Sequence, residues 1–240
     1  MNIDLTIKGR IHSLFTGGMV DGPGIRSVVF LSGCDLRCKY CHNPDTWQYE
    51  RGDEVTVQEI YDEVIRYKNY YKHGRGGVTV SGGEPMFQPL FLATLLEALK
   101  VQDIHTAIDT SGSCSPEHAK RILQSTDLLI YDMKTINPDI YFDVTGIPIN
   151  RSLNVLNLAS EMNIDTWVRF VLVPGLTDNM DDIHEMARYL KEFINITKIE
   201  VLPFHKKGEY KWADLKIPYE LRDTEPPSNE LVREVEKILC

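Results

Sequence analysis

Strand-like and helix-like segments alternate along the chain from about residue 27 to its end. The strand-like segments are rich in β-branched and other apolar residues, and they occupy residues 27–31, 78–81, 105–109, 128–132, 166–173 and 198–203. Strands that alternate with helices pair in parallel, because each helix returns the chain to the same end of the sheet. The pattern predicts an α/β fold in which six parallel strands form an open or partial barrel.

The segments between the strands carry the apolar spacing and the end signals of helices. Thr56 and Glu59 form a capping-box pair, and apolar positions then recur every three or four residues to about Lys72. Similar patterns predict helices at residues 90–100, 116–124, 152–162, 180–193 and 229–239. Residues 208–227 contain three prolines and many charges, so we expect a surface loop there.

Length and charge narrow the class of protein. The chain has 240 residues, enough to bury a substantial core, and we expect one domain over residues 1–240. A net charge of -9 argues against a nucleic-acid partner, which would normally attract a basic surface. Apolar runs are too short for a membrane span, and the N-terminal segment lacks the apolar core of a signal peptide. We therefore expect a cytoplasmic protein without a membrane partner.

Polar residues follow four of the predicted strands directly. These clusters are residues 81–84, 109–112, 132–134 and 203–205. In parallel sheets and barrels, binding sites form where the carboxyl ends of the strands meet. The four clusters predict one site at this rim of the sheet.

Three of the five cysteines, Cys34, Cys38 and Cys41, lie close together after the first predicted strand. An odd number of cysteines in a reducing compartment does not indicate a disulfide framework, and we expect Cys114 to be packed and Cys240 to be exposed. Three thiolates suit an iron-sulfur cluster or zinc. A four-iron cluster held by three cysteines leaves one iron with an open coordination position, where a substrate can bind.

Two other interpretations of this loop stay open on its residues alone. The segment from Cys38 to His42 has the C-x-x-C-H spacing of a c-type haem attachment site, but that attachment requires export, which the sequence does not signal. A zinc site with His42 as the fourth ligand is chemically possible. Structural zinc sites usually draw their ligands from two separated pairs, however, and the chain has no second pair.

Further segments accompany the cysteine motif along nearly the whole chain. They are Asp21-Gly-Pro-Gly-Ile-Arg26, Cys41-His-Asn-Pro-Asp-Thr-Trp47, Ser81-Gly-Gly-Glu84 and Val201-Leu-Pro-Phe-His205. With the C-x3-C-x2-C spacing, they resemble the pyruvate formate-lyase activating enzymes, which are glycyl-radical enzyme activases of the radical S-adenosylmethionine (SAM) superfamily. The resemblance implies a partial (β/α)6, TIM-like barrel with the radical SAM core.

The resemblance also implies an activity and its cofactors. A [4Fe-4S] cluster would cleave S-adenosylmethionine reductively to a 5'-deoxyadenosyl radical, which generates a glycyl radical on pyruvate formate-lyase under anaerobic conditions. No cysteine occurs between residues 43 and 77, so we expect a single cluster. Activation of a different glycyl-radical enzyme is the alternative activity, and a non-catalytic, metal-binding electron carrier is the alternative of another class.

Individual residues receive roles from the same resemblance. Cys34, Cys38 and Cys41 would hold the cluster, and Asp21 would lie near the reacting glycine of the partner. Contacts to S-adenosylmethionine are implied for Tyr40, Cys41, His42, Gly83, Asp132, Met133, Lys134, Arg169 and His205. A monovalent-cation site, for K+ or Na+, is implied at Asp109, Thr110, Ile130 and Asp132. Such a cation would relieve the repulsion between two aspartates and the cofactor's carboxylate.

Basic residues near the cysteine loop bear on the electron donor. Arg10, Arg26, Arg37 and Lys39 lie within or near that loop in an otherwise acidic chain. A local basic patch of this kind would dock an acidic protein through complementary charge. We therefore expect flavodoxin or ferredoxin as the reductant.

Overall fold

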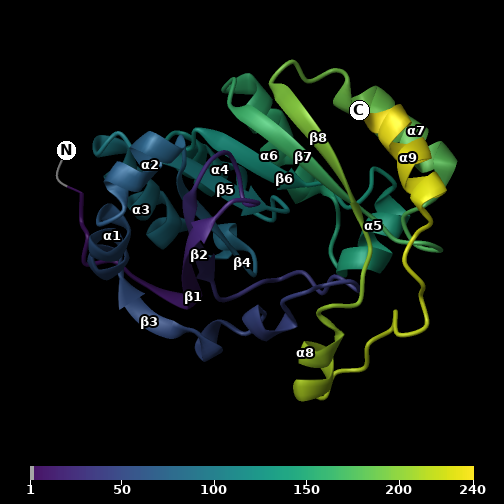
Figure 1. Ribbon diagram of the computed structural model, residues 1–240, viewed down its shortest axis with the longest axis horizontal. Coiled ribbons are helices and arrows are strands. Elements are labelled where there is room, and N and C mark those ends of the chain that lie inside the picture. Colours follow the sequence, from purple (N-terminus) through teal and green to yellow (C-terminus); the bar gives the residue numbers. More distant parts are fainter. Residues whose placement is uncertain (1–2) are drawn as a thin grey trace.

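The computed structural model describes residues 3–240, and an eight-stranded sheet forms its centre (Figure 1). The strands are β1 (Lys8–Gly18), β2 (Arg26–Leu31), β3 (Asp53–Thr56), β4 (Gly77–Gly82), β5 (His105–Thr110), β6 (Leu128–Asp132), β7 (Asp165–Leu172) and β8 (Ile196–Pro203). Their order across the sheet is β3-β1-β2-β4-β5-β6-β7-β8. The six strands from β2 to β8 in this order are parallel, as predicted. Within the described residues β3 and β8 are the two edges, so the barrel is partial and open.

Helices connect the successive parallel strands (Figure 1). They are α1 (Val57–Ile65), α2 (Lys68–Gly74), α3 (Pro89–Val101), α4 (Pro116–Leu123), α5 (Pro138–Thr145), α6 (Asn150–Glu161) and α7 (Met180–Leu190), with α8 (Glu209–Asp214) and α9 (Asn229–Leu239) after β8. Short 3-10 turns occur at Pro44–Thr46, Tyr49–Arg51 and Pro85–Phe87. No helix in residues 3–240 combines the length and the apolar character needed to cross a membrane.

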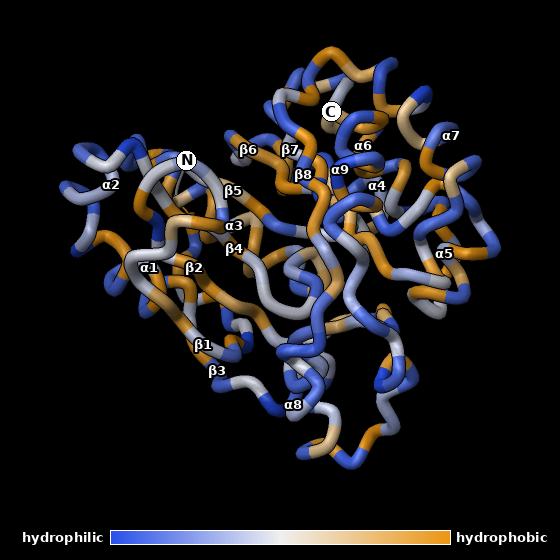
Figure 2. Tube along the Cα trace, turned by 45° about the vertical axis from the view of Figure 1, so that its right-hand side comes forward, coloured by the Kyte–Doolittle hydropathy of each residue, from blue (hydrophilic) through white to orange (hydrophobic). Residues whose placement is uncertain are grey.

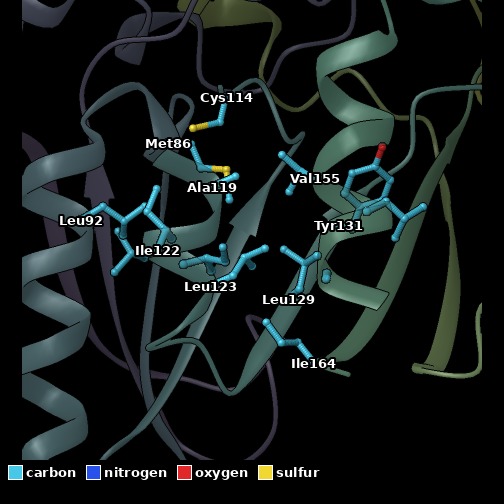
Figure 3. Close-up of a cluster of buried hydrophobic side chains, with 14 of the residues drawn as sticks. Met86, Leu92, Cys114, Ala119, Ile122, Leu123, Leu129, Tyr131, Val155 and Ile164 are labelled. Atoms are coloured by element: carbon cyan, nitrogen blue, oxygen red, sulfur yellow. The ribbon is translucent and has the colours of Figure 1, made fainter. Parts of the chain in front are cut away.

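The main core lies between the sheet and the helices that pack on it. Side chains of α3, α4 and α6 meet those of β6 there (Figure 3), including Leu92, Ile122, Leu123, Leu129, Tyr131 and Val155. Apolar positions accordingly concentrate in the strands of the sheet, as the colouring of Figure 2 shows. Cys114 belongs to this core and Cys240 is exposed, which confirms both predictions.

Two strands, β1 and β3, were not predicted. β1 pairs antiparallel with β2, and β3 pairs antiparallel with β1, so both lie at one edge of the sheet. Most of their residues are exposed or half-buried. Half-exposed antiparallel strands of this kind lack the continuous apolar run by which a buried parallel strand is recognised.

The helix predicted from residue 56 to about Lys72 is two helices. The capping box of Thr56 and Glu59 is present as predicted, but α1 ends at Ile65 and α2 begins at Lys68. The Tyr71 hydroxyl donates to the Val64 carbonyl oxygen at 3.0 Å. This bond holds the Tyr71 side chain of α2 against the end of α1. The buried apolar face therefore runs on from α1 to α2, although the backbone helix is interrupted between them.

Residues 208–227 are only in part the surface loop that we predicted: many of them are exposed and residues 215–227 form no helix or strand, but the segment is anchored. They contain α8, and the side chains of Trp212, Tyr219 and Leu221 are buried in a second, smaller core. The Trp212 indole N–H donates to the Cys41 carbonyl oxygen at 2.9 Å, and its ring packs edge-on against Trp47. Irregularly spaced buried side chains leave no periodic pattern in a sequence, which explains the error. The segment therefore supports the cysteine loop from one side.

Replacing Trp212 with alanine should lower the free energy of unfolding by about 3–5 kcal/mol, because a large buried side chain leaves a cavity. Urea-induced unfolding of the metal-free chain measures this loss. Tyr210→Ala on the same helix is the matched control, since Tyr210 is 62% exposed and should change stability by no more than about 0.5 kcal/mol. Equal losses in the two variants would contradict a supporting role for Trp212.

Candidate active site

Cys34, Cys38 and Cys41 lie on the loop after β2 and line one cavity of about 430 Å³ at the carboxyl end of the sheet. All three are free thiols. The loop is held in place because the backbone N–H groups of Arg37 and Lys39 donate to carbonyl oxygens at the end of α5. The three sulfur ligands are thus fixed on one wall of the cavity.

Burial makes these cysteines poor acids in the absence of a metal. Loss of hydration raises the pKa of all three thiols, to about 12 for Cys38. A bound metal cluster would supply the positive charge that stabilises the buried thiolates. The donor set therefore fits an iron-sulfur cluster, which takes thiolate ligands.

A site for a single metal ion needs several ligands around one point, unlike a site for a four-iron cluster. In residues 3–240, no three His, Cys, Asp or Glu side chains converge on a point where they could hold a single ion. A mononuclear zinc site with His42 as a ligand has no preformed cage in the described chain. In a four-iron cluster, by contrast, each cysteine binds a different iron atom.

The glycine turn after β4 packs directly against the cysteine loop. A Cβ atom on Gly82 would lie 2.2 Å from the Leu31 carbonyl oxygen, and one on Gly83 would lie 2.4 Å from that of Gly33. Gly82 also has a φ of +124°, a conformation that L-residues with side chains rarely adopt. Close backbone contact with the start of the cysteine loop therefore requires both glycines.

Glu84 ends the same turn and joins it to the loop after β5. Its buried carboxylate accepts hydrogen bonds from the Met86 N–H, the Thr110 hydroxyl, and both the N–H and the hydroxyl of Ser111. Burial raises the pKa of Glu84, although these four donors oppose the shift. We did not assign Glu84 a role from the sequence. Its position after two glycines in the Ser81-Gly-Gly-Glu84 segment was the available signal.

Lys134 and Asp132 form an ion pair in the cavity, and the Lys134 ammonium lies 5.2 Å from the centre of the Tyr40 ring. Burial alone would lower the pKa of Lys134, but the Asp132 carboxylate and other neighbours outweigh it and raise this pKa. The Tyr40 hydroxyl and the Asp132 Oδ1 atom are buried and have no hydrogen-bond partner within residues 3–240. Buried polar atoms are rarely left unpaired, so these two are available to a bound molecule.

Arg169 organises the side of the cavity formed by β5, β7 and β8. It donates from Nη1 to Asp109 at 3.1 Å, from Nε to Glu200 at 3.0 Å, and from Nη2 to the Val20 carbonyl oxygen. Burial raises the pKa of Asp109 to about 6, although Arg169 opposes the shift. Burial also raises the pKa of Asp21, which lies beside this group.

Two stacked histidines also line the cavity. The rings of His42 and His205 stack with centroids 4.3 Å apart and an interplanar angle of 27°. The His42 Nε2 atom lies 3.0 Å from the His205 carbonyl oxygen, so it donates there when protonated. This bond links the cysteine loop to the chain that follows β8.

Most of the residues expected at the site surround this cavity. Those that line it are Cys34, Cys38, Tyr40, Cys41, His42, Gly83, Asp109, Thr110, Asp132, Lys134, Arg169 and His205. Asp21, Ile130 and Met133 do not line it. The Ile130 side chain packs with Ala107 and Leu128, and the Met133 side chain lies in the main core. A role for Ile130 or Met133 would therefore depend on main-chain atoms.

Comparisons with known proteins agree with this architecture. The model of the radical SAM superfamily matches residues 28–190. The chain is 43% identical over 235 residues to the pyruvate formate-lyase-activating enzyme of Staphylococcus epidermidis, covering 95% of this chain and 94% of that protein. Identity to the enzyme of the same name from Staphylococcus aureus strain USA300 is also 43%, covering 95% of this chain and 93% of that protein.

Two solved structures show the same fold. A domain of a pyruvate-formate lyase-activating enzyme from Bacteroides vulgatus has a TM-score of 0.57 and 25% identity, covering 68% of this chain and 92% of that one. Streptococcus suis SuiB, bound to its precursor peptide SuiA, has a TM-score of 0.67 and 19% identity, covering 88% of this chain and 45% of that one. The chain therefore belongs to the radical SAM superfamily and, within it, to the family of pyruvate formate-lyase-activating enzymes.

Proposed function

We propose that this chain activates pyruvate formate-lyase by generating a glycyl radical on it, with S-adenosylmethionine bound at a [4Fe-4S] cluster on Cys34, Cys38 and Cys41. One observation carries the proposal: the three cysteines share a cavity with paired charges from β5, β6 and β7. The names of the relatives and their 43% identity over nearly the full length support it. When bound, the cluster and the cofactor supply the electron and the 5'-deoxyadenosyl radical that removes hydrogen from glycine.

The chain's own residues would bind and orient the cofactor. The Lys134 ammonium is suited to the carboxylate of S-adenosylmethionine, and the unpaired Asp132 Oδ1 atom can accept from its amino group. The stacked His42 and His205 rings offer a flat aromatic surface for the adenine ring. The Tyr40 hydroxyl, which has no partner among the described residues, can donate or accept a hydrogen bond with the cofactor.

We further propose a K+ or Na+ site formed by Asp109, Asp132 and the backbone at Thr110 and Ile130. The free Asp132 Oδ1 atom supports it, and carboxylate and carbonyl oxygens are the donors that hard cations prefer. Arg169 and Lys134 already pair with the two aspartates. A bound cation would add its positive charge to those of Arg169 and Lys134 and would help to attract the carboxylate of the cofactor.

Asp132→Asn should weaken S-adenosylmethionine binding and reduce its dependence on K+ and Na+, while the iron and sulfide content stays unchanged. Titration calorimetry of the anaerobically reconstituted protein measures the affinity for S-adenosylmethionine and its dependence on the cation. In the unchanged protein, the effect of the cation should weaken as pH falls through about 6, because Asp109 then takes up a proton. Asp143→Asn, which alters an exposed carboxylate outside the cavity, is the control. Normal affinity in Asp132→Asn, with no response to either cation, would contradict the site.

Flavodoxin or ferredoxin is our proposal for the electron donor, but the expected basic patch needs correction. Arg26 is fully buried, Lys39 pairs with Asp143 and Glu220, and Arg10 pairs with Glu54. Arg37 is exposed and donates only to backbone carbonyl oxygens of its own loop among the described residues. Arg37, adjacent to Cys38, is therefore the remaining basic group that supports docking at this surface.

The proposed function is tested by mixing the reconstituted protein anaerobically with S-adenosylmethionine, a reductant and pyruvate formate-lyase. A glycyl radical should appear in the electron paramagnetic resonance spectrum of the partner. Cys34→Ala, Cys38→Ala and Cys41→Ala should each abolish it, because each removes a ligand of the cluster, whereas Cys114→Ala and Cys240→Ala should retain it.

The same assay tests the electron donor and the partner. If dithionite supports radical formation but reduced flavodoxin and reduced ferredoxin both fail to do so, the proposed reductants are wrong. If S-adenosylmethionine is cleaved but no radical forms on pyruvate formate-lyase, the protein substrate would instead be another glycyl-radical enzyme. Full activity in any of the three cysteine variants would contradict the cluster assignment.

A further inference from the structure

Asp35 is a charged residue of the cysteine loop that has no part in the proposed function. It follows Cys34 directly, and its Oδ1 atom is buried without a hydrogen-bond partner among residues 3–240. The Arg151 Nη1 atom lies 3.8 Å from the Asp35 Oδ2 atom, but the Arg151 side chain is 66% exposed. Exposed ion pairs add little stability, whereas a buried oxygen without a partner lowers it. Stability alone therefore does not explain a carboxylate at this position.

The carboxylate of Asp35 joins two loops. The hydroxyl of Ser113, a buried residue of the loop after β5 (residues 111–115), donates to the Asp35 Oδ2 atom at 2.7 Å. No backbone hydrogen bond connects this loop with the cysteine loop in the part of the chain that the structure describes. A hydrogen bond to a charged acceptor is stronger than one between neutral groups. Asp35 therefore provides a strong direct link between the two loops.

The loop after β5 is held from further sides. The Glu84 carboxylate accepts from the N–H group and the hydroxyl of Ser111, at 3.0 and 2.8 Å. The Ser152 hydroxyl, on α6, donates to the Ser111 carbonyl oxygen at 2.5 Å. Cys114, which follows Ser113, packs in the main core (Figure 3). The loop after β5 is thus a fixed support to which Asp35 attaches the cysteine loop.

Both of the linked loops contribute to the cavity. Cys34, adjacent to Asp35, lines it, and Thr110 and Ser111 line it at the end of β5 and the start of the next loop. Neither Asp35 nor Ser113 lines the cavity, so neither would touch the cofactor. The bond between them lies behind the cavity wall and fixes the position of Cys34 relative to Thr110 and Ser111.

We propose that Asp35 is a positioning residue that, through Ser113, fixes the cysteine loop to the loop after β5 and so sets the spacing between the cluster and the bound cofactor. The inference rests on the proposed function, because it takes the cluster and S-adenosylmethionine to occupy this cavity. Asp35 acts through the backbone next to Cys34, and Ser113 acts through the backbone that follows Thr110 and Ser111.

Four variants test the link. Ser113→Ala removes the donor and Asp35→Ala removes the acceptor, whereas Asp35→Asn keeps an acceptor oxygen and should stay close to wild-type behaviour. Ser27→Ala is the matched control, because Ser27 is also a buried serine whose hydroxyl makes one side-chain hydrogen bond, to Tyr71. Ser27 lies near the start of β2, at the end of that strand away from the cysteine loop.

The metal-free chain shows whether the link orders the cysteine loop. Amide hydrogen exchange of residues 33–37 should become about tenfold faster in Ser113→Ala and in Asp35→Ala, the factor expected for one lost hydrogen bond to a charged group. Both substitutions remove the same bond, so the double variant should exchange no faster than either single one. Exchange of β6 should not change, which separates local loosening from a general loss of stability.

The anaerobically reconstituted protein shows whether the link sets the spacing. Iron and sulfide content should stay unchanged in Ser113→Ala and Asp35→Ala, because the three cysteines remain. The electron paramagnetic resonance spectrum of the reduced cluster without cofactor should also stay unchanged. The Kd for S-adenosylmethionine, measured by titration calorimetry on the oxidised cluster, should rise about tenfold, because binding must then order the loosened loop.

Each outcome decides the proposal. Faster exchange and weaker cofactor binding in Ser113→Ala and Asp35→Ala, but not in Asp35→Asn or Ser27→Ala, would support it. Unchanged exchange, unchanged affinity, equal changes in Ser27→Ala, or loss of iron and sulfide would overturn it. If the wild-type protein binds S-adenosylmethionine at its cluster but forms no radical on pyruvate formate-lyase, the proposed function fails instead, and the exchange and affinity measurements still decide the role of Asp35.

Discussion

Two pairs of charges, Lys134 with Asp132 and Arg169 with Asp109, line one cavity together with three thiols. Charge removed from water must be paired, and this requirement explains much of the architecture around the cavity. Arg169 on β7 pairs with Glu200 on the neighbouring strand β8 and with Asp109 on β5, which lies on the far side of β6. Lys134 follows its partner Asp132 by two residues, just after the end of β6. The thiols have no such partner, and a metal cluster would supply the missing positive charge.

The loops around the cavity are fixed mainly by backbone hydrogen bonds and close contacts. Gly82 and Gly83 allow the turn after β4 to touch the cysteine loop, and Glu84 ties that turn to the loop after β5. Trp212 and His205 hold the cysteine loop from the other side. Rigid placement of this kind is what a site needs in order to direct a reactive species to one bond.

The parallel core of the fold could be predicted from the sequence because buried strands and their connecting helices repeat a strong apolar pattern. The antiparallel strand β1 could not, since its half-exposed residues lack that pattern, and Trp212 gave no periodic signal. Most of the expected site residues line one cavity because the resemblance identified short motifs at strand ends. Arg26 appeared to be a surface charge in the sequence, and only the three-dimensional contacts of its guanidinium show it to be buried.

The central claim is that a radical formed in this cavity removes hydrogen directly from a glycine of the partner protein. Pyruvate formate-lyase containing glycine deuterated at the α-carbon tests it, with the 5'-deoxyadenosine product analysed by mass spectrometry after a single round of activation. We expect one deuterium in the 5'-deoxyadenosine for each glycyl radical formed. A glycyl radical accompanied by 5'-deoxyadenosine without deuterium would contradict direct transfer, and with it this account of the site.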